Sequence, residues 1–589
     1  MIRICRYLSK SEVGQLFLVI AFIVTQVWLD LKLPDYMADI TRQVETPGSQ
    51  MSEIWQAGGK MLLVSFLSLA CAVLTSYFAV RVASSFSQHL RSLEFAKVES
   101  FSTAELGQFS TASLITRSTN DVTQVQMFIT MGLVMLVKAP IMAVWAVCKI
   151  AGKGFEWTMA TGIAVVILLV IVGLLMAFVM PKFKRMQALT DNINQVAREN
   201  LTGLRVVRAY NAENYQESKF TKANDELTGT QLSTTRAMGL MMPVMNTIMN
   251  GLMLAVYWIG AYLINAAGFQ DRITLFGNMV VFSSYAVQVI MSFLLMSMVF
   301  VLWPRADVSA HRIMEVLDTK PSITDGSERS GKPGSEGQVA FHDVSFTYPG
   351  ASAPILEHVD FSVDKGQTIA FIGSTGSGKS TLINLVPRFA DVSGGEVMVD
   401  GVDVRNYEVK ALRDKIGYVP QQSFMFRGTV ESNVAYGDQA EGVNDAEKLE
   451  RVKEAVGVAQ AEEFVSGMPD TYHSDISQGG SNVSGGQKQR LSIARAVWRK
   501  PEILIFDDSF SALDFKTDRE VRDALKTQMK GTTMMIVAQR IGTIMDADQI
   551  VVLDQGRVVG KGTHQELLKT CEVYQQIAKS QLTEKELAA

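Results

Sequence analysis

The fold of this chain is decided by the stretch Gly373-Ser-Thr-Gly-Ser-Gly-Lys-Ser-Thr381, which matches the pattern GxxxxGK[ST] at every position. It follows a strand-like apolar run, Thr368–Ile372, and precedes a helical pattern. Glycines let backbone N–H groups turn inward around phosphate oxygens, and the positive end of the next helix points at the same place. We therefore expect Lys379 to reach the β- and γ-phosphates and the Ser380 hydroxyl to ligate Mg²⁺. The alternative, a Gly-rich turn without a ligand, is disfavoured by the flanking strand and helix.

A second strand pattern ends in a carboxylate. The run Ile503-Leu-Ile-Phe-Asp507 is apolar up to its last residue, as expected of a strand whose aspartate holds the Mg²⁺ shell. Between the two strands lies Val483-Ser-Gly-Gly-Gln487. This pentapeptide resembles the LSGGQ signature of ATP-binding-cassette (ABC) transporters and differs from it only in having valine for leucine.

The resemblance covers nearly the whole chain and implies roles for further residues. Tyr348 matches the aromatic residue that stacks on adenine, and Gln421 matches the glutamine that links Mg²⁺ and the attacking water to the membrane domain. Ser511 and Asp514 match the D-loop. The ATP-binding residues implied in this way are Tyr348, Gly373, Ser374, Thr375, Gly376, Ser377, Gly378, Lys379, Ser380, Thr381, Gln421 and Asp507, and those implied for Mg²⁺ are Ser380, Gln421 and Asp507.

In the ABC family two cassettes close head to tail, so that each ATP lies between one chain's phosphate loop and the other chain's signature. The signature residues expected to act on the partner's ATP are Ser484, Gly485, Gly486 and Gln487. A chain with one copy of each motif cannot complete a site alone. The resemblance therefore implies a second half-transporter as partner.

Two further positions depart from the family pattern. The family usually carries glutamate after the Walker B aspartate to polarise the hydrolytic water, and here that residue is Asp508. Misplacing a general base, which contributes about 10²–10⁴-fold, should slow hydrolysis. At the position of the family's switch histidine this chain has Gln539. Its amide can bind a γ-phosphate but cannot relay a proton. Together with Gln421, Asp508 and Gln539 are the expected catalytic positions. The two departures predict a site that binds ATP but hydrolyses it poorly. The alternative is that both are neutral variants in a homodimer that hydrolyses ATP slowly.

The composition indicates that part of the chain lies in lipid. Charged residues make up 19% of the 589 residues and hydrophobic residues 48%, whereas soluble proteins average about 25% charged. The formal charge of −4 argues against a nucleic-acid partner. The four cysteines are scattered without metal-ligand spacing, which excludes a disulfide scaffold and disfavours a zinc site.

The apolar residues gather in the first half, where segments long enough to cross about 30 Å of hydrocarbon recur. We place six spans near 13–36, 55–80, 125–150, 156–180, 238–264 and 275–303. The connections 81–124 and 181–237 should continue these helices into the cytosol, and the resemblance implies short coupling helices near 107–116 and 209–215. Lys and Arg are concentrated in 181–237, so we expect both termini in the cytoplasm.

The predicted fold class is an α-helical six-span transmembrane domain of the ABC exporter type followed by an α/β P-loop nucleotide-binding domain. We assign 1–317 to the transmembrane domain, 318–337 to an exposed linker rich in Pro, Gly and Ser, 338–579 to the nucleotide-binding domain and 580–589 to a tail.

The substrate path is less clearly marked. A methionine face on the fifth span includes Met245 and Met249, which suit a promiscuous apolar surface, although ordinary helix packing is the favoured alternative. Polar residues on the sixth span either line a cavity or form interhelical hydrogen bonds. They include Tyr285, Gln288 and Ser292. Lys138 lies within the third span, with Asp30 as a candidate counter-charge, and we favour a structural or gating role.

The sequence thus predicts half of an ATP-driven exporter in a bacterial cytoplasmic membrane, paired with a catalytically stronger half. Its cargo is expected to be amphiphilic: drugs, lipids or small peptides. Three rivals remain open at this stage, namely a homodimeric lipid flippase, a non-transporting ATP-binding regulatory subunit, and an importer with an exporter-like membrane domain.

Overall fold

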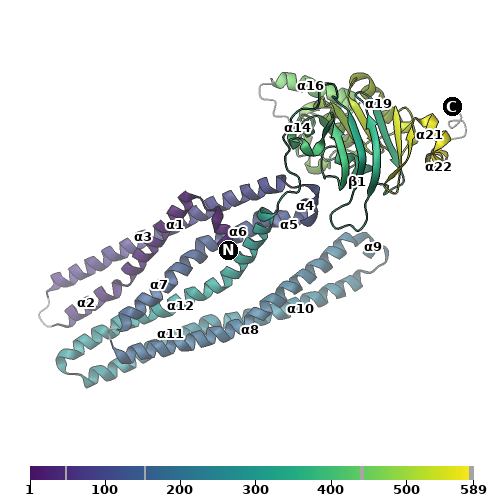
Figure 1. Ribbon diagram of the computed structural model, residues 1–589. Coiled ribbons are helices and arrows are strands. Elements are labelled where there is room, and N and C mark those ends of the chain that lie inside the picture. Colours follow the sequence, from purple (N-terminus) through teal and green to yellow (C-terminus); the bar gives the residue numbers. More distant parts are fainter. Residues whose placement is uncertain (47–49, 152–153, 438–443, 583–589) are drawn as a thin grey trace. The chain divides into compact units, whose positions relative to one another are not determined.

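The computed structural model describes residues 1–46, 50–151, 154–437 and 444–582 (Figure 1). The chain forms two compact units. The first comprises Met1–Lys97 and Ala112–Asp318, and the second comprises Val98–Thr111 and the chain from Thr319 onward.

The first unit is helical and contains, among the described residues, six helical stretches long and apolar enough to cross a membrane. This confirms the predicted six-span fold. A short η1 (Ile2–Tyr7) leads into the stretches, which are built from α1 (Lys10–Asp30), α2 (Leu33–Glu45), α3 (Met51–Glu99), α5 (Thr111–Thr116), α6 (Val122–Met127), α7 (Leu133–Ala151), α8 (Phe155–Thr202), α9 (Leu204–Ala209), α10 (Glu213–Gly239), α11 (Met241–Ala266) and α12 (Phe269–Asp318).

Each stretch runs well beyond the span predicted from hydropathy, because few glycines or prolines interrupt the polar continuations. The first is broken between α1 and α2, where Pro34 occupies the first turn of α2 and cannot continue a helix from the preceding turn. The third contains two π-helical segments, Arg117–Asp121 and Phe128–Gly132. In Figure 1, α8 lies alongside α10 and α11, and α9 forms the turn at the free end of α8 and α10.

The second unit is an α/β domain with two main sheets. The six-stranded sheet has the order β12-β11-β3-β10-β9-β6, in which only the β11–β12 pair is antiparallel. Its strands are β3 (Thr368–Gly373), β6 (Ile416–Val419), β9 (Ile503–Asp507), β10 (Thr533–Val537), β11 (Gln549–Asp554) and β12 (Arg557–Gly562). An antiparallel sheet of order β2-β1-β4-β5 consists of β1 (Val339–Phe346), β2 (Leu356–Val363), β4 (Gly394–Val399) and β5 (Val402–Asp403).

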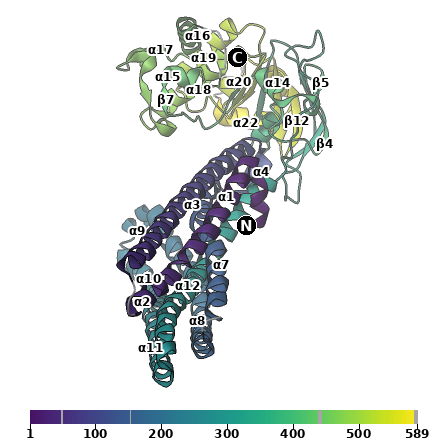
Figure 2. The ribbon, with the colours of Figure 1, turned by 90° about the vertical axis from the view of Figure 1, so that its left-hand side faces the viewer.

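Helices cover these sheets and form a separate lobe. Figure 2 shows α15 to α18 gathered away from β4 and β5. The helices are α13 (Lys379–Leu385), α14 (Val409–Asp414), α15 (Val430–Val434), α16 (Asp445–Val458), α17 (Glu462–Ser466), α18 (Gly485–Trp498), α19 (Phe515–Gln528), α20 (Ile541–Ile544), α21 (His564–Thr570) and α22 (Glu572–Gln581). Strands β9 and β10 are fully buried, so their carboxyl ends are held rigidly.

The long connections contain short helices in or beside the ranges predicted for them. The first range, 107–116, covers the end of α4 (Thr103–Gln108) and all of α5 (Thr111–Thr116). In the second connection, α9 ends at Ala209, where the range 209–215 begins. Helix α4 starts where Ser102 and Glu105 form a capping box, whose reciprocal bonds satisfy two backbone donors.

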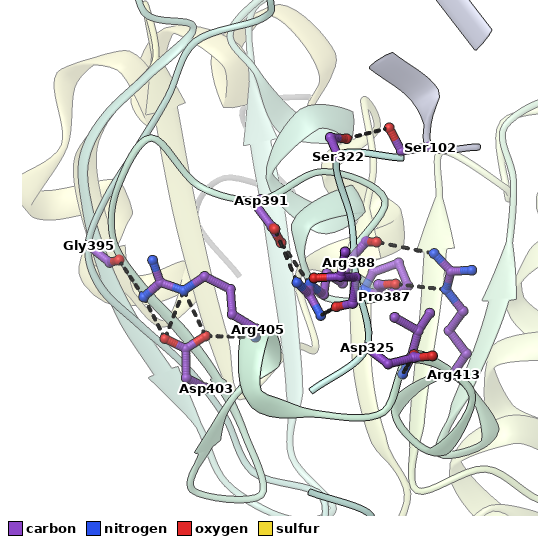
Figure 3. Close-up of polar contacts among 12 residues, drawn as sticks. Ser102, Ser322, Asp325, Pro387, Arg388, Asp391, Gly395, Asp403, Arg405 and Arg413 are labelled. Carbon is purple, nitrogen blue, oxygen red and sulfur yellow. Dashed lines mark hydrogen bonds and ion pairs between the residues drawn. The ribbon is translucent and has the colours of Figure 1, made fainter. Parts of the chain in front are cut away.

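Helix α4 belongs to the second unit and contacts the segment predicted as a linker. Ser102 Oγ lies 3.0 Å from Ser322 Oγ, as Figure 3 shows, and the Ser322 N–H donates to Glu105 Oε1 at 3.2 Å. The Thr103 hydroxyl donates to the carbonyl oxygen of Phe389 at 3.4 Å. The sequence did not show that residues 98–111 pack with the nucleotide-binding part.

The predicted linker is mostly exposed but bonded along its length. Its Gly326 N–H donates to the Tyr407 carbonyl and its Lys332 N–H to the Asp400 carbonyl. The Thr324 carbonyl accepts from Arg388, whose guanidinium also holds Asp391 (Figure 3). A Cβ on Gly326 would lie 2.1 Å from Asn406 O, so the absence of a side chain permits the close approach. We refer to residues 319–337 as the docked strap.

Candidate functional site

The candidate site forms where three neighbouring parallel strands end. Strand β10 pairs with β3 on one side and β9 on the other. Their carboxyl ends therefore bring together the phosphate loop after β3, Asp507 and Asp508 after β9, and Gln539 after β10. The crevice outside the carboxyl ends of parallel strands is where α/β sheets bind ligands.

The phosphate loop has the geometry predicted from its glycines. Gly378 caps α13 in the left-handed region, with φ of 93°, and a Cβ there would lie 2.8 Å from Leu356 Cδ2 and 3.0 Å from Ile355 O. Only glycine fits this turn without strain. Lys379 folds back over the loop, and its Nζ donates to the carbonyl oxygens of Gly373 (3.0 Å) and Ser374 (2.7 Å). The ammonium thus occupies the concave side of the loop, where a phosphate group would replace these carbonyls as its partner.

Two of the three residues implied for Mg²⁺, Ser380 and Asp507, lie in direct contact, whereas the third, Gln421, contacts Asp508. The Ser380 hydroxyl donates to Asp507 Oδ1 at 2.6 Å. A hydroxyl and a carboxylate are the hard oxygen ligands that Mg²⁺ prefers, and a bound metal would also supply water ligands and substrate phosphates. The donor set therefore fits the ion, which would neutralise the charge that develops on the phosphates.

The three predicted catalytic residues meet at one oxygen atom. This atom belongs to the carboxylate of Asp508, and its partners are Gln539 and Gln421. Gln539 Nε2 donates to Asp508 Oδ2 at 2.8 Å, and Gln421 Nε2 donates to the same atom at 3.4 Å. The Asp508 side chain is only 7% exposed. Its backbone is left-handed, with φ of 47°, and its N–H donates to the Val537 carbonyl. The carboxylate is thus held by amides at the place where the family carries its hydrolytic glutamate.

The charges of the site perturb one another. Burial raises the pKa of Asp508, and the adjacent Asp507 raises it further, whereas the Gln421 and Gln539 hydrogen bonds and Lys379 lower it. Burial likewise raises the pKa of Asp507, against the Ser380 hydrogen bond and Lys379. Burial lowers the pKa of Lys379, against the attraction of both carboxylates. The site thus sets two carboxylates against one ammonium, and an incoming Mg²⁺-nucleotide would change the interactions among these charges.

Other predicted residues lie beside this centre. Tyr348 is 44% exposed, and its hydroxyl lies 3.0 Å from Thr381 Oγ1, so the ring lies at the rim of the phosphate loop. The Ser511 hydroxyl donates to the Asp508 carbonyl at 2.7 Å, and Asp514 caps α19 through Thr517. The D-loop is therefore bonded directly to the residue after Walker B.

The signature lies at the exposed beginning of α18. Ser484 caps the helix and forms a capping box with Gln487, while Gly485 is exposed and Gly486 is half-buried. The positive end of a 14-residue helix is therefore free to receive a phosphate. Val483, the residue that differs from the family pattern, is 9% exposed and belongs to the core of the helical lobe. The Val483 side chain is thus turned away from the exposed beginning of α18, where a phosphate would bind.

Sequence reasoning missed three residues that hold this site. Arg540 donates to the carbonyls of Ser511 (3.3 Å) and Leu513 (3.4 Å), and Gln581 bonds the backbone around Gln539. Gln489 of α18 accepts from the Ser423 hydroxyl at 2.7 Å, which ties the signature helix to the loop of Gln421. An isolated Arg or Gln carries no pattern, and only the backbone fold reveals these roles.

In the first unit, most candidate substrate residues lie among packed helices. The buried Tyr285 hydroxyl donates to the Leu31 carbonyl (2.8 Å) and to Asp35 (2.9 Å), and the Ser292 hydroxyl donates within its own helix. For Tyr285 the structure favours interhelical bonding over cavity lining. Met245 is buried and Met249 is partly buried in the same core, whereas Gln288 Oε1 has no hydrogen-bond partner among the described residues.

Lys138 finds its candidate counter-charge. Its Nζ lies 3.8 Å from Asp30 Oδ2, and Asp30 also accepts from the Ser68 hydroxyl. An ammonium among apolar helices is costly without such a partner. The pair joins α1 to α7, so the predicted counter-charge is present.

Comparison with known families matches both units. Residues 13–293 match the family described as ABC transporter transmembrane region, and residues 356–511 match the family described as ABC transporter. An uncharacterized ABC transporter ATP-binding protein of Mycobacterium tuberculosis is 39% identical, over 94% of this chain and 93% of its own length.

Two further likenesses cover most of the chain. An ATP-dependent lipid A-core flippase of Aromatoleum aromaticum is 32% identical, over 88% of this chain and 84% of its own length. The solved structure of a bacterial Atm1-family ABC exporter with ATP bound has a TM-score of 0.79 and 24% identity, and it covers 97% of this chain and 98% of that chain. At that identity the likeness establishes the fold.

Proposed function

This chain belongs to the ABC transporter family, and on that premise we propose that it is the hydrolytically weak half of a heterodimeric exporter. As a member of this family, the chain is a multi-pass membrane protein with an ATPase activity that is coupled to transport. The proposal concerns the division of labour: this chain's signature completes a competent site on a different partner, while its own phosphate loop forms a site that retains ATP.

One observation carries the proposal. The position of the hydrolytic carboxylate holds Asp508, and its Oδ2 accepts hydrogen bonds from both Gln539 and Gln421. Both amides occupy the same carboxylate oxygen, and the side chain, which is one methylene shorter than that of glutamate, keeps the carboxylate close to the backbone and away from the place of a hydrolytic base. Gln539 cannot accept a proton at neutral pH. The two replacements therefore act on the same step.

The surfaces of the chain support dimerisation. The tip around α9 exposes apolar side chains, with Leu204 44%, Val206 61% and Tyr210 79% exposed. The helical lobe exposes an aromatic patch of Phe424, Phe426 and Tyr436, in which the last two rings stack at 4.2 Å. Exposed apolar surface of this kind marks interaction sites. We infer that these two surfaces face the second half-transporter.

The proposed cycle follows from these parts. ATP binding brings the two cassettes together, the short helices α4 and α9 transmit closure to the membrane helices, and hydrolysis at the partner's site resets the transporter. Both termini lie in the cytoplasm, where Lys and Arg of the long connections are concentrated. The cargo is an amphiphile, such as a drug, a lipid or a small peptide.

The test uses the purified chain with and without a second half-transporter from the neighbouring reading frame, chosen for a glutamate after its Walker B aspartate. We expect the chain alone to hydrolyse ATP at most about 1% as fast as the pair, since a general base contributes about 10²–10⁴-fold. Brisk hydrolysis by the chain alone would refute the proposal.

A homodimeric lipid flippase is the second candidate. It is favoured by the likeness to proteins named ATP-dependent lipid A-core flippase, at 32% and 31% identity. It requires that Asp508 supports turnover in a dimer of identical chains. Movement of a fluorescent lipid across vesicles that contain only this chain would establish it.

A further inference from the structure

The segment Gln539–Ile541, between β10 and α20, is held from three directions. The Gln539 side chain donates to Asp508. Arg540 donates to the D-loop carbonyls of Ser511 and Leu513, and its guanidinium lies 4.9 Å from the centre of the Phe515 ring. The third contact is made by Gln581 to the backbone of the segment itself. We call this segment the switch segment.

Gln581, the last residue of α22, binds the switch segment on both sides of Arg540. Its Nε2 donates to the Gln539 carbonyl at 2.8 Å, and its Oε1 accepts from the Ile541 N–H at 2.9 Å. One primary amide thus uses its donor and its acceptor together, as a neighbouring β-strand would. Both bonds must break before the backbone at Gln539 can shift.

The support for this amide is rigid. Helix α22 packs through the fully buried Tyr574 and Ala578, and the Tyr574 hydroxyl lies 2.6 Å from His564 Nδ1. On the same helix, Gln575 Nε2 donates to the Leu568 carbonyl at 2.8 Å. Gln581 therefore joins the switch segment to the packed core, although it lies 42 residues from Gln539 in the chain.

We propose that Gln581 is a positioning residue for the nucleotide switch: it fixes the backbone from which Gln539 reaches either Asp508 or the γ-phosphate of ATP. The inference rests on the proposed role of Gln539 as the group that contacts the γ-phosphate. It makes the end of α22 part of the mechanism by which the site distinguishes ATP from ADP.

The test measures equilibrium binding of a non-hydrolysable ATP analogue and of ADP to the full chain. Gln581→Ala should weaken binding of the analogue about five- to tenfold and leave that of ADP within about twofold, because only the γ-phosphate reaches Gln539. Gln581→Glu still accepts from Ile541 but cannot donate to the Gln539 carbonyl, so we expect the same selective loss. Gln575→Ala is the matched control, since it removes an amide-to-carbonyl bond of the same helix, and both affinities should stay unchanged.

Combining Gln581→Ala with Gln539→Ala separates positioning from general stability. Gln539→Ala alone should weaken binding of the analogue but not that of ADP. Adding Gln581→Ala should then have no further effect on either affinity. The inference is overturned if Gln581→Ala behaves like Gln575→Ala, or if it weakens ADP as much as the analogue. If Gln539→Ala itself leaves the analogue unaffected, then the assigned role of Gln539 fails, whatever Gln581 does.

Discussion

Two surfaces of this chain, the phosphate-loop side and the signature side that we propose to face the partner's ATP, depart from the family pattern to different extents. On the phosphate-loop side, the departures Asp508 and Gln539 bond to each other at the reacting end of the site. On the signature side, Val483, the one residue of the pentapeptide that differs from the pattern, is buried in the core, while Ser484 and Gly485 stay exposed at the start of α18. The departures on the phosphate-loop side therefore lie at the proposed reacting groups, whereas Val483 on the signature side lies in the packed core.

This difference teaches that a count of motif mismatches is a poor guide to activity. A mismatch alters catalysis when its side chain faces the reacting atoms, and burial of Val483 removes that possibility. The same contrast gives the order of the expected effects, since a variant on the signature side should impair the assembled transporter more than a variant on the phosphate-loop side.

The largest effect is expected from Gly485→Asp. A Cβ at Gly485 meets nothing within 4 Å, so the variant should fold. Its carboxylate would lie at the positive end of α18, where it repels the partner's γ-phosphate. Loss of a preorganised anion contact costs about 10²–10³-fold in turnover. We expect ATPase activity of the assembled pair to fall by that factor, with Gly485→Ala as the steric control; an unimpaired pair would mean that this signature does not serve the partner's site.

The next effect comes from restoring the family residues on the other surface. Because Asp508 and Gln539 form one unit, Asp508→Glu or Gln539→His alone should raise the ATPase rate of the purified chain only about two- to threefold, and the double variant about 10–100-fold. Steady-state phosphate release with all four proteins measures this non-additivity. A double variant whose gain only equals the product of the two single gains would show that the two residues act independently.

The chemistry-bearing motifs could be predicted because their geometry is local. The strand, glycine loop and helix around Lys379 form a continuous segment, and their structure follows from backbone requirements at a few glycines. The resemblance predicted Asp507 and Gln539 at the ATP site, and the parallel pairing of β10 with β3 and β9 is the physical reason that they lie beside that loop. The six spans followed from length and hydropathy.

Features that depend on tertiary packing could not be predicted. The composition of residues 318–337 indicated an exposed linker, but it did not show that Gly326 makes room for contact with Asn406 or that the docked strap is bonded in place. Helix α4 begins at its capping box and not where the family pattern suggested. Tyr285 is polar within a span, and only the position of α2 shows that its hydroxyl bonds Asp35. Each outcome depends on a partner distant in the chain.

A smaller effect tests whether the phosphate-loop side still binds nucleotide by its intended geometry. Gly376 and Gly378 both have positive φ, but only a Cβ on Gly378 meets Leu356 and Ile355. Gly378→Ala should therefore weaken ATP binding to the chain about tenfold, and Gly376→Ala less, since left-handed backbone costs about 1–3 kcal/mol and the clash adds to it. Isothermal titration of each variant checks the order, and equal losses would show that backbone strain alone decides binding.

The smallest effect is expected from Val483→Leu, which restores the family's signature sequence. Because Val483 lies in the packed core of the helical lobe, the added methylene should cost about 1–3 kcal/mol of stability through overpacking. It should leave the ATPase rate of the assembled pair within about twofold, because no ligand-facing atom moves. Thermal unfolding and ATPase assays on the same preparation separate the two effects. A large gain in ATPase would show that this signature is also weakened, and the contrast between the two surfaces would no longer hold.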